Sequence, residues 1–182
     1  MHENIKNLKI LVTGASGYIG SELVTKLTGL GCSVAVIKRA SSNLTSLNHV
    51  LDKISIYECD SSTESVIKIV KDCNPDVVVH LASLFIAEHK SADIENLIAS
   101  NLLFSTQIVE AMKHNNVKFL VNTGTSWEHF NNSKYNPVCL YAATKHAFES
   151  ILEYYVQTSD LRIITLKLFD TYGPRDTRPK LI

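Results

Sequence analysis

The segment KILVTGASGYIG, residues 9–20, decides the fold, because a short apolar run leads directly into glycines at spacing three and three. Glycine permits a tight turn between a strand and a helix, close packing of that helix, and close approach of a ligand to the backbone. The N–H groups at the start of the helix are then free to bind a phosphate. A purely structural turn is the alternative. We predict a dinucleotide site that includes Gly14, Ser16, Gly17, Tyr18, Ile19 and Gly20.

Outward from this turn, short β-branched runs alternate with longer amphipathic segments through the whole chain. This alternation is typical of βαβ units. We predict an α/β fold, a doubly wound parallel sheet of the Rossmann type with helices on both faces. Several strands are nearly continuous apolar runs, as strands covered on both faces should be. The predicted strands are 8–13, 33–37, 54–58, 76–81, 117–122 and 162–168, the helices are about 17–29, 62–72, 93–114 and 141–157, and 130–138 is a polar loop.

The composition excludes several classes of protein. The chain has 182 residues, 45% hydrophobic and 20% charged, with 18 basic and 18 acidic side chains. It is therefore globular, and zero net charge argues against a nucleic-acid or anionic-membrane partner. The N-terminus has neither a signal peptide nor a membrane span, so we expect a cytoplasmic protein. The four cysteines (32, 59, 73 and 139) have no metal spacing, which predicts reduced, mostly buried thiols and no metal site.

The end of the second predicted strand indicates which dinucleotide is bound. Lys38 and Arg39 stand there, and no Asp or Glu occurs between Val34 and Asp52. A carboxylate at this point would bind the ribose hydroxyls of NAD, whereas cations pair with the 2′-phosphate of NADP. The sequence favours NADP(H), with NAD(H) possible if the two cations are simply solvated.

Other polar or small residues follow the third and fourth predicted strands. Asp60 and Ser61 follow the third, and Asp60 is either a partner for the adenine amino group or a helix N-cap. Leu81, Ala82 and Ser83 close the fourth, where small residues let a cofactor pass close to the backbone. We include all five in the predicted cofactor site.

Tyr141 and Lys145 are four residues apart at the start of a predicted helix, so both project from one face. An ammonium beside a phenol lowers its pKa and makes it a proton donor or acceptor near neutral pH. The alternative is a surface pair of no chemical consequence. After a nucleotide turn and a fifth strand, the pair indicates catalysis.

Together, these motifs resemble the extended short-chain dehydrogenases/reductases, which include NAD(P)-dependent nucleotide-sugar epimerases, dehydratases and reductases. The matching residues are TGASGYIG (13–20), DVVVHLAS (76–83), Asn101, YAATK (141–145) and LKLFDTYGPRDTRP (166–179). The resemblance implies that Tyr141 is the acid–base, that Lys145 binds the nicotinamide ribose and tunes Tyr141, and that Asn101 supports the site. It also implies a homodimer formed through helices 93–114 and 141–157.

The chain departs from the family pattern at the end of the fifth strand. The family's substrate-binding hydroxyl falls on Gly124, so a neighbouring hydroxyl must serve: Thr125, with Thr123 and Ser126 as alternatives. The Asp-Glu pair that the dehydratases carry next to that position is missing, which disfavours elimination chemistry. Family members also continue well beyond this length, so 1–170 is expected to be the NAD(P)-binding domain and 171–182 the start of a truncated substrate domain.

Three functions remain as hypotheses. NTGTSW and NPVCLYAATK look like reductases of CDP-linked deoxysugars, which favours an NADP-dependent reductase of a nucleotide-linked 4-keto-6-deoxy sugar serving polysaccharide biosynthesis. An NAD-dependent nucleotide-sugar 4-epimerase would use the same residues. A non-catalytic NADP-sensing module is the third, although such modules usually lack the Tyr–Lys pair.

Overall fold

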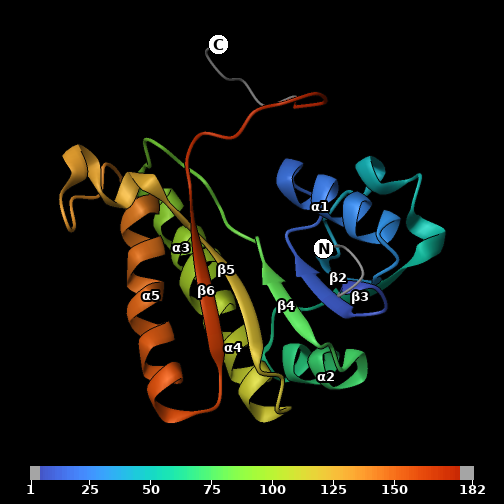
Figure 1. The fold of residues 1–182 in the computed structure, drawn as a ribbon. Helices are drawn as coiled ribbons and strands as arrows, with labels where there is room; N and C mark the ends of the chain where they lie inside the picture. The colour runs from blue at the N-terminus through green and yellow to red at the C-terminus, as the bar shows by residue number, and fades with distance from the viewer. Residues whose placement is uncertain (1–4, 177–182) are drawn as a thin grey trace.

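Six parallel strands form a single sheet in the order β3-β2-β1-β4-β5-β6 (Figure 1), as the alternating pattern predicts. The structure is a computed structural model in which residues 5–176 are described. Each strand is followed by a crossover to the next, so the carboxyl ends of all six meet at one edge of the sheet. The strands are β1 Lys9–Thr13, β2 Ser33–Arg39, β3 Ile54–Cys59, β4 Val77–His80, β5 Phe119–Thr125 and β6 Arg162–Leu168.

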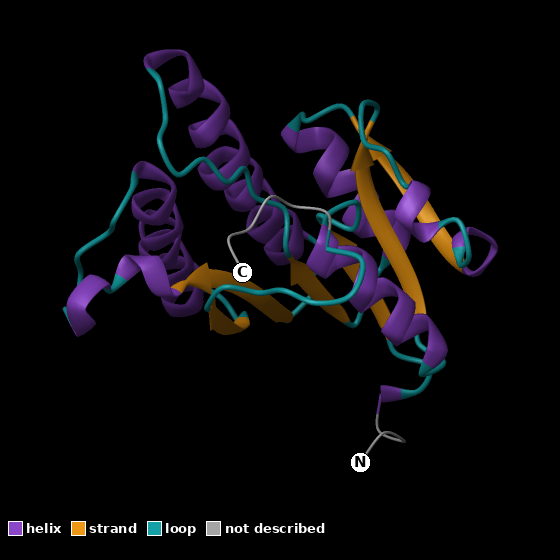
Figure 2. Cartoon of the chain, turned by 90° about the horizontal axis from the view of Figure 1, so that it is seen from above, coloured by secondary structure: helices purple, strands orange, loops and turns teal. Residues whose placement is uncertain are grey.

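Helices lie on either side of the strands (Figure 2), and each side has its own apolar core. Side chains alternate along β1, so Leu11 joins the core under α2, α4 and α5, whereas Ile10 and Val12 join the core under α1. The chain therefore changes face between β1 and β4, where ligands of such sheets bind. The α-helices are α1 Tyr18–Gly29, α2 Thr63–Cys73, α3 Ile94–Ile98, α4 Phe104–His114 and α5 Leu140–Thr158.

Three segments differ from the sequence prediction. The strand predicted at 117–122 runs instead over Phe119–Thr125, because pairing with β6 continues through Thr125 opposite Leu168. The helix predicted at 93–114 is interrupted by a π-helical turn at Ala99–Leu103. The polar loop contains the 3-10 turn Phe130–Asn132.

Four cysteine thiols are free, three of them buried, as predicted. Within residues 5–176, every helix is too short or too polar to cross a membrane.

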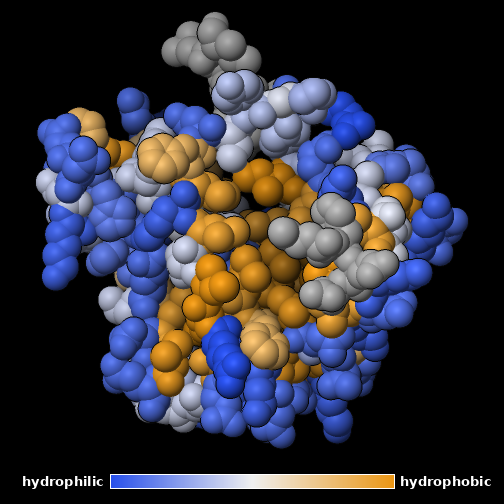
Figure 3. Space-filling model, in the orientation of Figure 1, coloured by the Kyte–Doolittle hydropathy of each residue, from blue (hydrophilic) through white to orange (hydrophobic). Residues whose placement is uncertain are grey.

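One face of β5 and β6 is open. Apolar side chains gather over the strands at the centre of the molecule (Figure 3), and Ile164 and Leu166 of β6 are 63% and 46% exposed. Parallel strands are normally covered on both faces. The cover on both faces that we expect for several strands does not extend to β6 within the described residues.

Candidate functional site

The three glycines after β1 are glycine for different reasons. Gly14 has φ +73°, and a Cβ on it would lie 2.6 Å from the backbone nitrogen of Ala82. A Cβ on Gly20 would lie 2.1 Å from the carbonyl oxygen of Gly14. A Cβ on Gly17 would meet only that same oxygen, at an ordinary 3.4 Å. Packing within the described chain thus explains glycine at 14 and 20, whereas Gly17 leaves room for a ligand.

The start of α1 is suited to an anion. Its N-cap is Gly17, which has no side chain to bond the first-turn N–H groups, and Ser16 and Gly17 are exposed. Tyr18 and Ile19, also in the predicted site, are partly buried at the start of the helix. The N–H groups of a helix start that has no side-chain cap and the helix dipole together favour a phosphate at this point.

His80 fastens the end of β4 beneath this turn. Its Nδ1 lies 2.8 Å from Oγ1 of Thr13, and its Nε2 lies 2.8 Å from Oγ of Ser105 on α4. Complete burial, together with the charge of Lys145, lowers the pKa of His80 to about 3, so the imidazole is neutral. The backbone of Leu81 and Ala82 then passes directly against Gly14.

The ends of β2 and β3 form a mixed patch of charge. Lys38 is paired with Glu58 of β3 at 2.5 Å, and Arg39 is exposed beside it. The sequence search for a carboxylate stopped at Asp52 and missed Glu58, which stands opposite Lys38 in the parallel register. The site therefore offers both cations and a carboxylate.

Asp60 is not the N-cap of α2. That role belongs to Ser62, whose hydroxyl accepts the Ser65 N–H, so the N-cap alternative for Asp60 is wrong. Asp60 is exposed and accepts the Ser62 N–H at 2.8 Å, and this hydrogen bond lowers the pKa of the Asp60 carboxyl. Ser61 between them has φ +71° and is exposed. Asp60 is thus a fixed carboxylate at the edge where the strands end.

Tyr141 and Lys145 lie one turn apart on α5, at the same edge of the sheet. Burial raises the pKa of the Tyr141 phenol, and a hydrogen bond with Ser83 opposes part of the rise. The net shift is therefore upward, and the lowering that we expect from Lys145 is not among its causes. Lys145 is 3% exposed, and its burial lowers the pKa of its own ammonium to about 8, opposed by Glu128 and Glu149.

Asn101 joins the loop after β4 to α5. It lies in the π-helical turn and is 1% exposed. Its Oδ1 accepts from Leu84 N–H at 2.7 Å and from Ser83 Oγ at 3.1 Å. Its Nδ2 donates to the Leu84 carbonyl and to Thr144 Oγ1, both at 3.0 Å. Ser83 and Thr144 are thus held by one amide.

The candidate hydroxyls after β5 differ in what they already bond. Thr123 Oγ1 donates its proton to the His80 carbonyl at 3.1 Å. Thr125 Oγ1 accepts the Trp127 N–H at 3.2 Å, which leaves its own proton available. Ser126 is partly buried in the turn that follows, Ser126–Glu128. This pattern favours Thr125 over Thr123 as a donor to a substrate oxygen.

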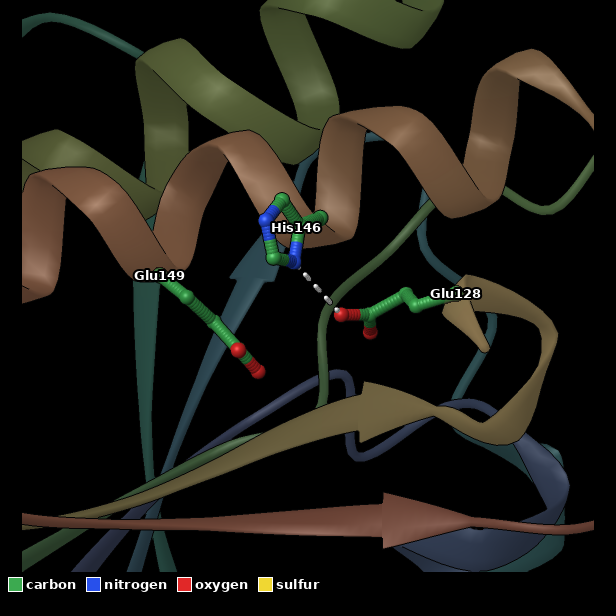
Figure 4. A group of neighbouring side chains, drawn as sticks. All are labelled: Glu128, His146 and Glu149. Carbon is green, nitrogen blue, oxygen red and sulfur yellow. Dashed lines mark ion pairs between the residues drawn. The ribbon is translucent and has the colours of Figure 1, made fainter. Parts of the chain in front are cut away.

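Two groups near the site escaped the sequence analysis. Phe85 stacks edge-on with both Trp127 and Tyr141, with ring centroids 5.5 and 5.0 Å apart, and forms an exposed aromatic wall. Glu128, His146 and Glu149 point toward one another behind β5 (Figure 4), with Glu128 fully buried. No local spacing links these residues, because Glu128 and the other two come from different elements.

Near the end of the described chain, Arg175 binds Glu22 on α1 through two hydrogen bonds, at 3.0 and 2.7 Å. The preceding Gly173 lies beside the Tyr18 hydroxyl. This segment therefore runs past the glycine turn. Residues 177–182, the last part of the predicted substrate domain, lie outside the described residues.

Comparisons with known proteins show the family and the fold. Residues 10–181 match the model of the NAD dependent epimerase/dehydratase family. The chain is 27% identical to CDP-abequose synthase of Salmonella muenchen and 28% identical to UDP-glucose 4-epimerase of Mycolicibacterium smegmatis, covering 97% and 92% of this chain. The solved UDP-glucose 4-epimerase of Thermus thermophilus, in complex with NAD, superposes with a TM-score of 0.82 at 28% identity over 92% of this chain. The chain spans 57% or 58% of the length of each of these proteins.

Proposed function

The chain belongs to the NAD dependent epimerase/dehydratase family, and on that premise we propose that it carries the cofactor site and proton donor of an NADP-dependent reductase of a nucleotide-linked 4-keto-6-deoxy sugar. The observation that carries the proposal is the Tyr141–Lys145 pair at the carboxyl edge of the sheet, beside the glycine turn. The similarity to CDP-abequose synthase supports a CDP-linked substrate.

The residues of the glycine turn fit a dinucleotide. The open approach at Gly17 and the uncapped start of α1 would hold the pyrophosphate, and Lys145 would hold the nicotinamide ribose. When bound, the reduced nicotinamide supplies a hydride to the keto carbon. Tyr141 donates a proton to the sugar oxygen, and Thr125 donates a hydrogen bond to that oxygen.

The raised pKa of Tyr141 supports the reductive direction. A phenol above its usual pKa is protonated at neutral pH, which suits a proton donor. An epimerase must first remove a proton from the substrate hydroxyl and therefore needs the phenolate. We rank reduction ahead of epimerisation on the similarity to CDP-abequose synthase, and the cofactor and turnover experiments test that ranking.

Cofactor choice is tested by titrating the chain with NADPH and NADH, followed by fluorescence. Lys38 and Arg39 favour the 2′-phosphate, so NADPH is expected to bind more tightly. Arg39→Gln should weaken NADPH about tenfold, the size of one charged hydrogen bond, and leave NADH unchanged. Tighter binding of NADH would assign NAD instead and make Glu58 the residue that selects it.

Turnover is tested in the whole protein by NADPH consumption with CDP-, dTDP-, GDP- and UDP-linked 4-keto sugars. Tyr141→Phe is expected to reduce turnover by about 100-fold or more and to leave NADPH affinity unchanged. Full activity of this variant would exclude Tyr141 as the proton donor.

A nucleotide-sugar 4-epimerase is the second candidate, supported by solved relatives in complex with NAD. It predicts NAD that stays bound through purification and interconversion of sugars without net consumption of cofactor. If the protein is a non-catalytic NADP-sensing module, the wild type and Tyr141→Phe should bind the cofactor with the same affinity, and neither should show turnover.

A homodimer through α4 and α5 is part of the proposal. Leu103, just before α4, and Tyr154 on α5 are 54% and 56% exposed. Burial of such side chains between two copies would supply the apolar core of an interface. Sedimentation equilibrium of the wild type and of Leu103→Lys tests it, and a monomeric wild type would reject it.

A further inference from the structure

Glu128 is the most deeply buried acid among the described residues near the site. Its side chain is 0% exposed, and its Oε1 accepts the Thr125 N–H at 2.9 Å. Its Oε2 forms an ion pair with Lys167 of β6 and lies 3.4 Å from Nδ1 of His146. The carboxylate therefore has one oxygen on the turn that carries Thr125 and the other in a charged cluster.

Lys167 joins the acids of that cluster. Its ammonium contacts Glu149 at 2.5 Å as well as Glu128. Ligand atoms of Glu128, His146 and Glu149 lie within 4.8 Å of one another, a grouping that could hold a metal ion. Lys167 is already paired with both carboxylates, and its positive charge would repel a divalent cation at this point. The geometry therefore favours an ion-pair cluster over a metal centre.

The cluster has one more negative charge than Lys167 balances. Lys145 is the second cation: it stands one helical turn before Glu149 on α5, and both carboxylates oppose the lowering of its pKa. The charges of three residues shift the pKa of Lys145: Glu128 after β5, Glu149 on α5 and Lys167 on β6. The charge of Lys145 in turn lowers the pKa of His80 on β4. Glu128 and Lys145 are buried there, whereas the side chains of Glu149 and Lys167 are partly exposed.

Gly124 shows that the cluster is packed against β5. A Cβ at this position would lie 2.9 Å from Cδ of Lys167, 3.0 Å from Oε1 of Glu128 and 3.1 Å from Oε1 of Glu149. The backbone of Gly124 has no positive φ, so crowding by these side chains, and not the backbone conformation, is what favours glycine there. The family resemblance predicts a hydroxyl side chain at position 124, and the two carboxylates occupy the space that such a side chain would need.

We propose that Glu128 is a positioning residue for the proposed reaction: its buried carboxylate fixes the turn that presents Thr125 and, with Glu149, supplies negative charge that offsets the Lys145 ammonium. The inference rests on the proposed function for its role in catalysis, but both of its physical parts can be measured without cofactor or substrate. Its failure is therefore distinguishable from failure of the proposed function.

The charge part is tested by the titration of Lys145, followed through its 13Cε NMR signal in lysine-labelled chain and assigned by its loss in Lys145→Met. The wild-type midpoint is expected near pH 8. Glu128→Gln and Glu149→Gln should move the midpoint to lower pH, because each removes a negative charge. Lys167→Met should move it to higher pH, because it removes a positive one.

A general loss of structure would not produce shifts of opposite sign. An unchanged midpoint in Glu128→Gln, or shifts of the same sign in Glu128→Gln and Lys167→Met, would overturn the charge part. Circular dichroism of each variant checks folding. If Glu128→Gln does not fold, the opposite shifts expected of Glu149→Gln and Lys167→Met decide the question.

The geometric part is tested by amide hydrogen exchange at Thr125. Glu128→Gln keeps an oxygen acceptor and should retain protection, whereas Glu128→Ala should speed exchange about tenfold or more. Glu149→Ala is the matched control, since Glu149 does not bond the Thr125 N–H, and it should leave exchange unchanged. Equal protection of Thr125 in the wild type and in Glu128→Ala would reject this part.

Discussion

At the scale of single residues, the glycine turn separates requirements of the fold from requirements of a ligand. A Cβ added at position 20 would lie 2.1 Å from a backbone oxygen, whereas a Cβ added at position 17 would make only an ordinary van der Waals contact. Sequence spacing treats the three glycines alike, because a motif records residue type and not the surroundings of each Cβ.

Substitution of these two glycines by alanine should therefore have different effects. Gly20→Ala should destabilise the chain by about 3 kcal/mol through overpacking. Gly17→Ala should cost about 1 kcal/mol or less, yet weaken NADPH binding tenfold or more because the Cβ enters the approach of the pyrophosphate. Urea unfolding and fluorescence titration measure the two effects, and equal effects of both variants on stability would contradict the distinction.

Lys145 is expected to make the folded chain less stable at neutral pH. Its folded pKa of about 8 lies below the usual 10.5, so the folded state binds fewer protons between these values. Stability should rise as pH increases from about 8 to 10.5. Lys145→Met should abolish that rise and add up to about 3 kcal/mol at pH 7. Urea unfolding at pH 7 and pH 10 checks the sign; a less stable variant at both pH values would refute it.

Residues linked by local spacing could be predicted, and those linked through the fold could not. Tyr141 and Lys145 are neighbours on one helix face, so their separation in sequence is sufficient to pair them. Glu58 meets Lys38 only because β3 pairs with β2, and Glu128 meets Lys167 only because the turn after β5 lies beside β6. Register and loop conformation decide both contacts.

At the scale of elements, the interrupted helix before β5 explains how Asn101 reaches both the loop after β4 and α5. The π-helical turn of Ala99–Leu103 adds a residue to one turn and directs Asn101 inward. Apolar periodicity predicts a helix through 93–114, but it does not reveal that the π-helical turn contains one residue more than an α-helical turn. The end of β5 was missed for a related reason, since pairing with β6 extends the strand through residues that locally favour a turn.

Asn101→Ala should loosen the link between the loop after β4 and α5. It removes four hydrogen bonds and leaves buried partners unsatisfied, at a cost of roughly 2–4 kcal/mol. Asn96→Ala, on the exposed side of α3, is the control and should change stability by less than about 0.5 kcal/mol. Urea unfolding gives both values, and hydrogen exchange at Leu84 should accelerate only in Asn101→Ala.

At the scale of the whole molecule, the open face of β5 and β6 is the main departure from a covered parallel sheet. The apolar run of β6 predicts a strand, but it cannot indicate whether anything lies against each face. Whether a face is covered depends on which other segments pack against it, and the residues of the strand itself do not encode this.

This face should bind the hydrophobic dye ANS. Ile164→Lys combined with Leu166→Lys should reduce dye fluorescence severalfold and preserve the circular dichroism spectrum, because both side chains already face outward. Ile163→Lys is the contrasting variant, since Ile163 packs against the core on the other face and its replacement should unfold the chain. Unchanged dye binding in the double variant would show that the dye binds elsewhere.

The two apolar cores on opposite sides of the sheet have a thermodynamic consequence. One lies under α1 and the other under α2, α4 and α5, so only the strands connect them. A dinucleotide lying across the boundary between β1 and β4 would touch the turn above the first core and α5 above the second. At 100 times its Kd it would add about 2.7 kcal/mol to folding. Calorimetry would then record the melting of both halves as one cooperative event.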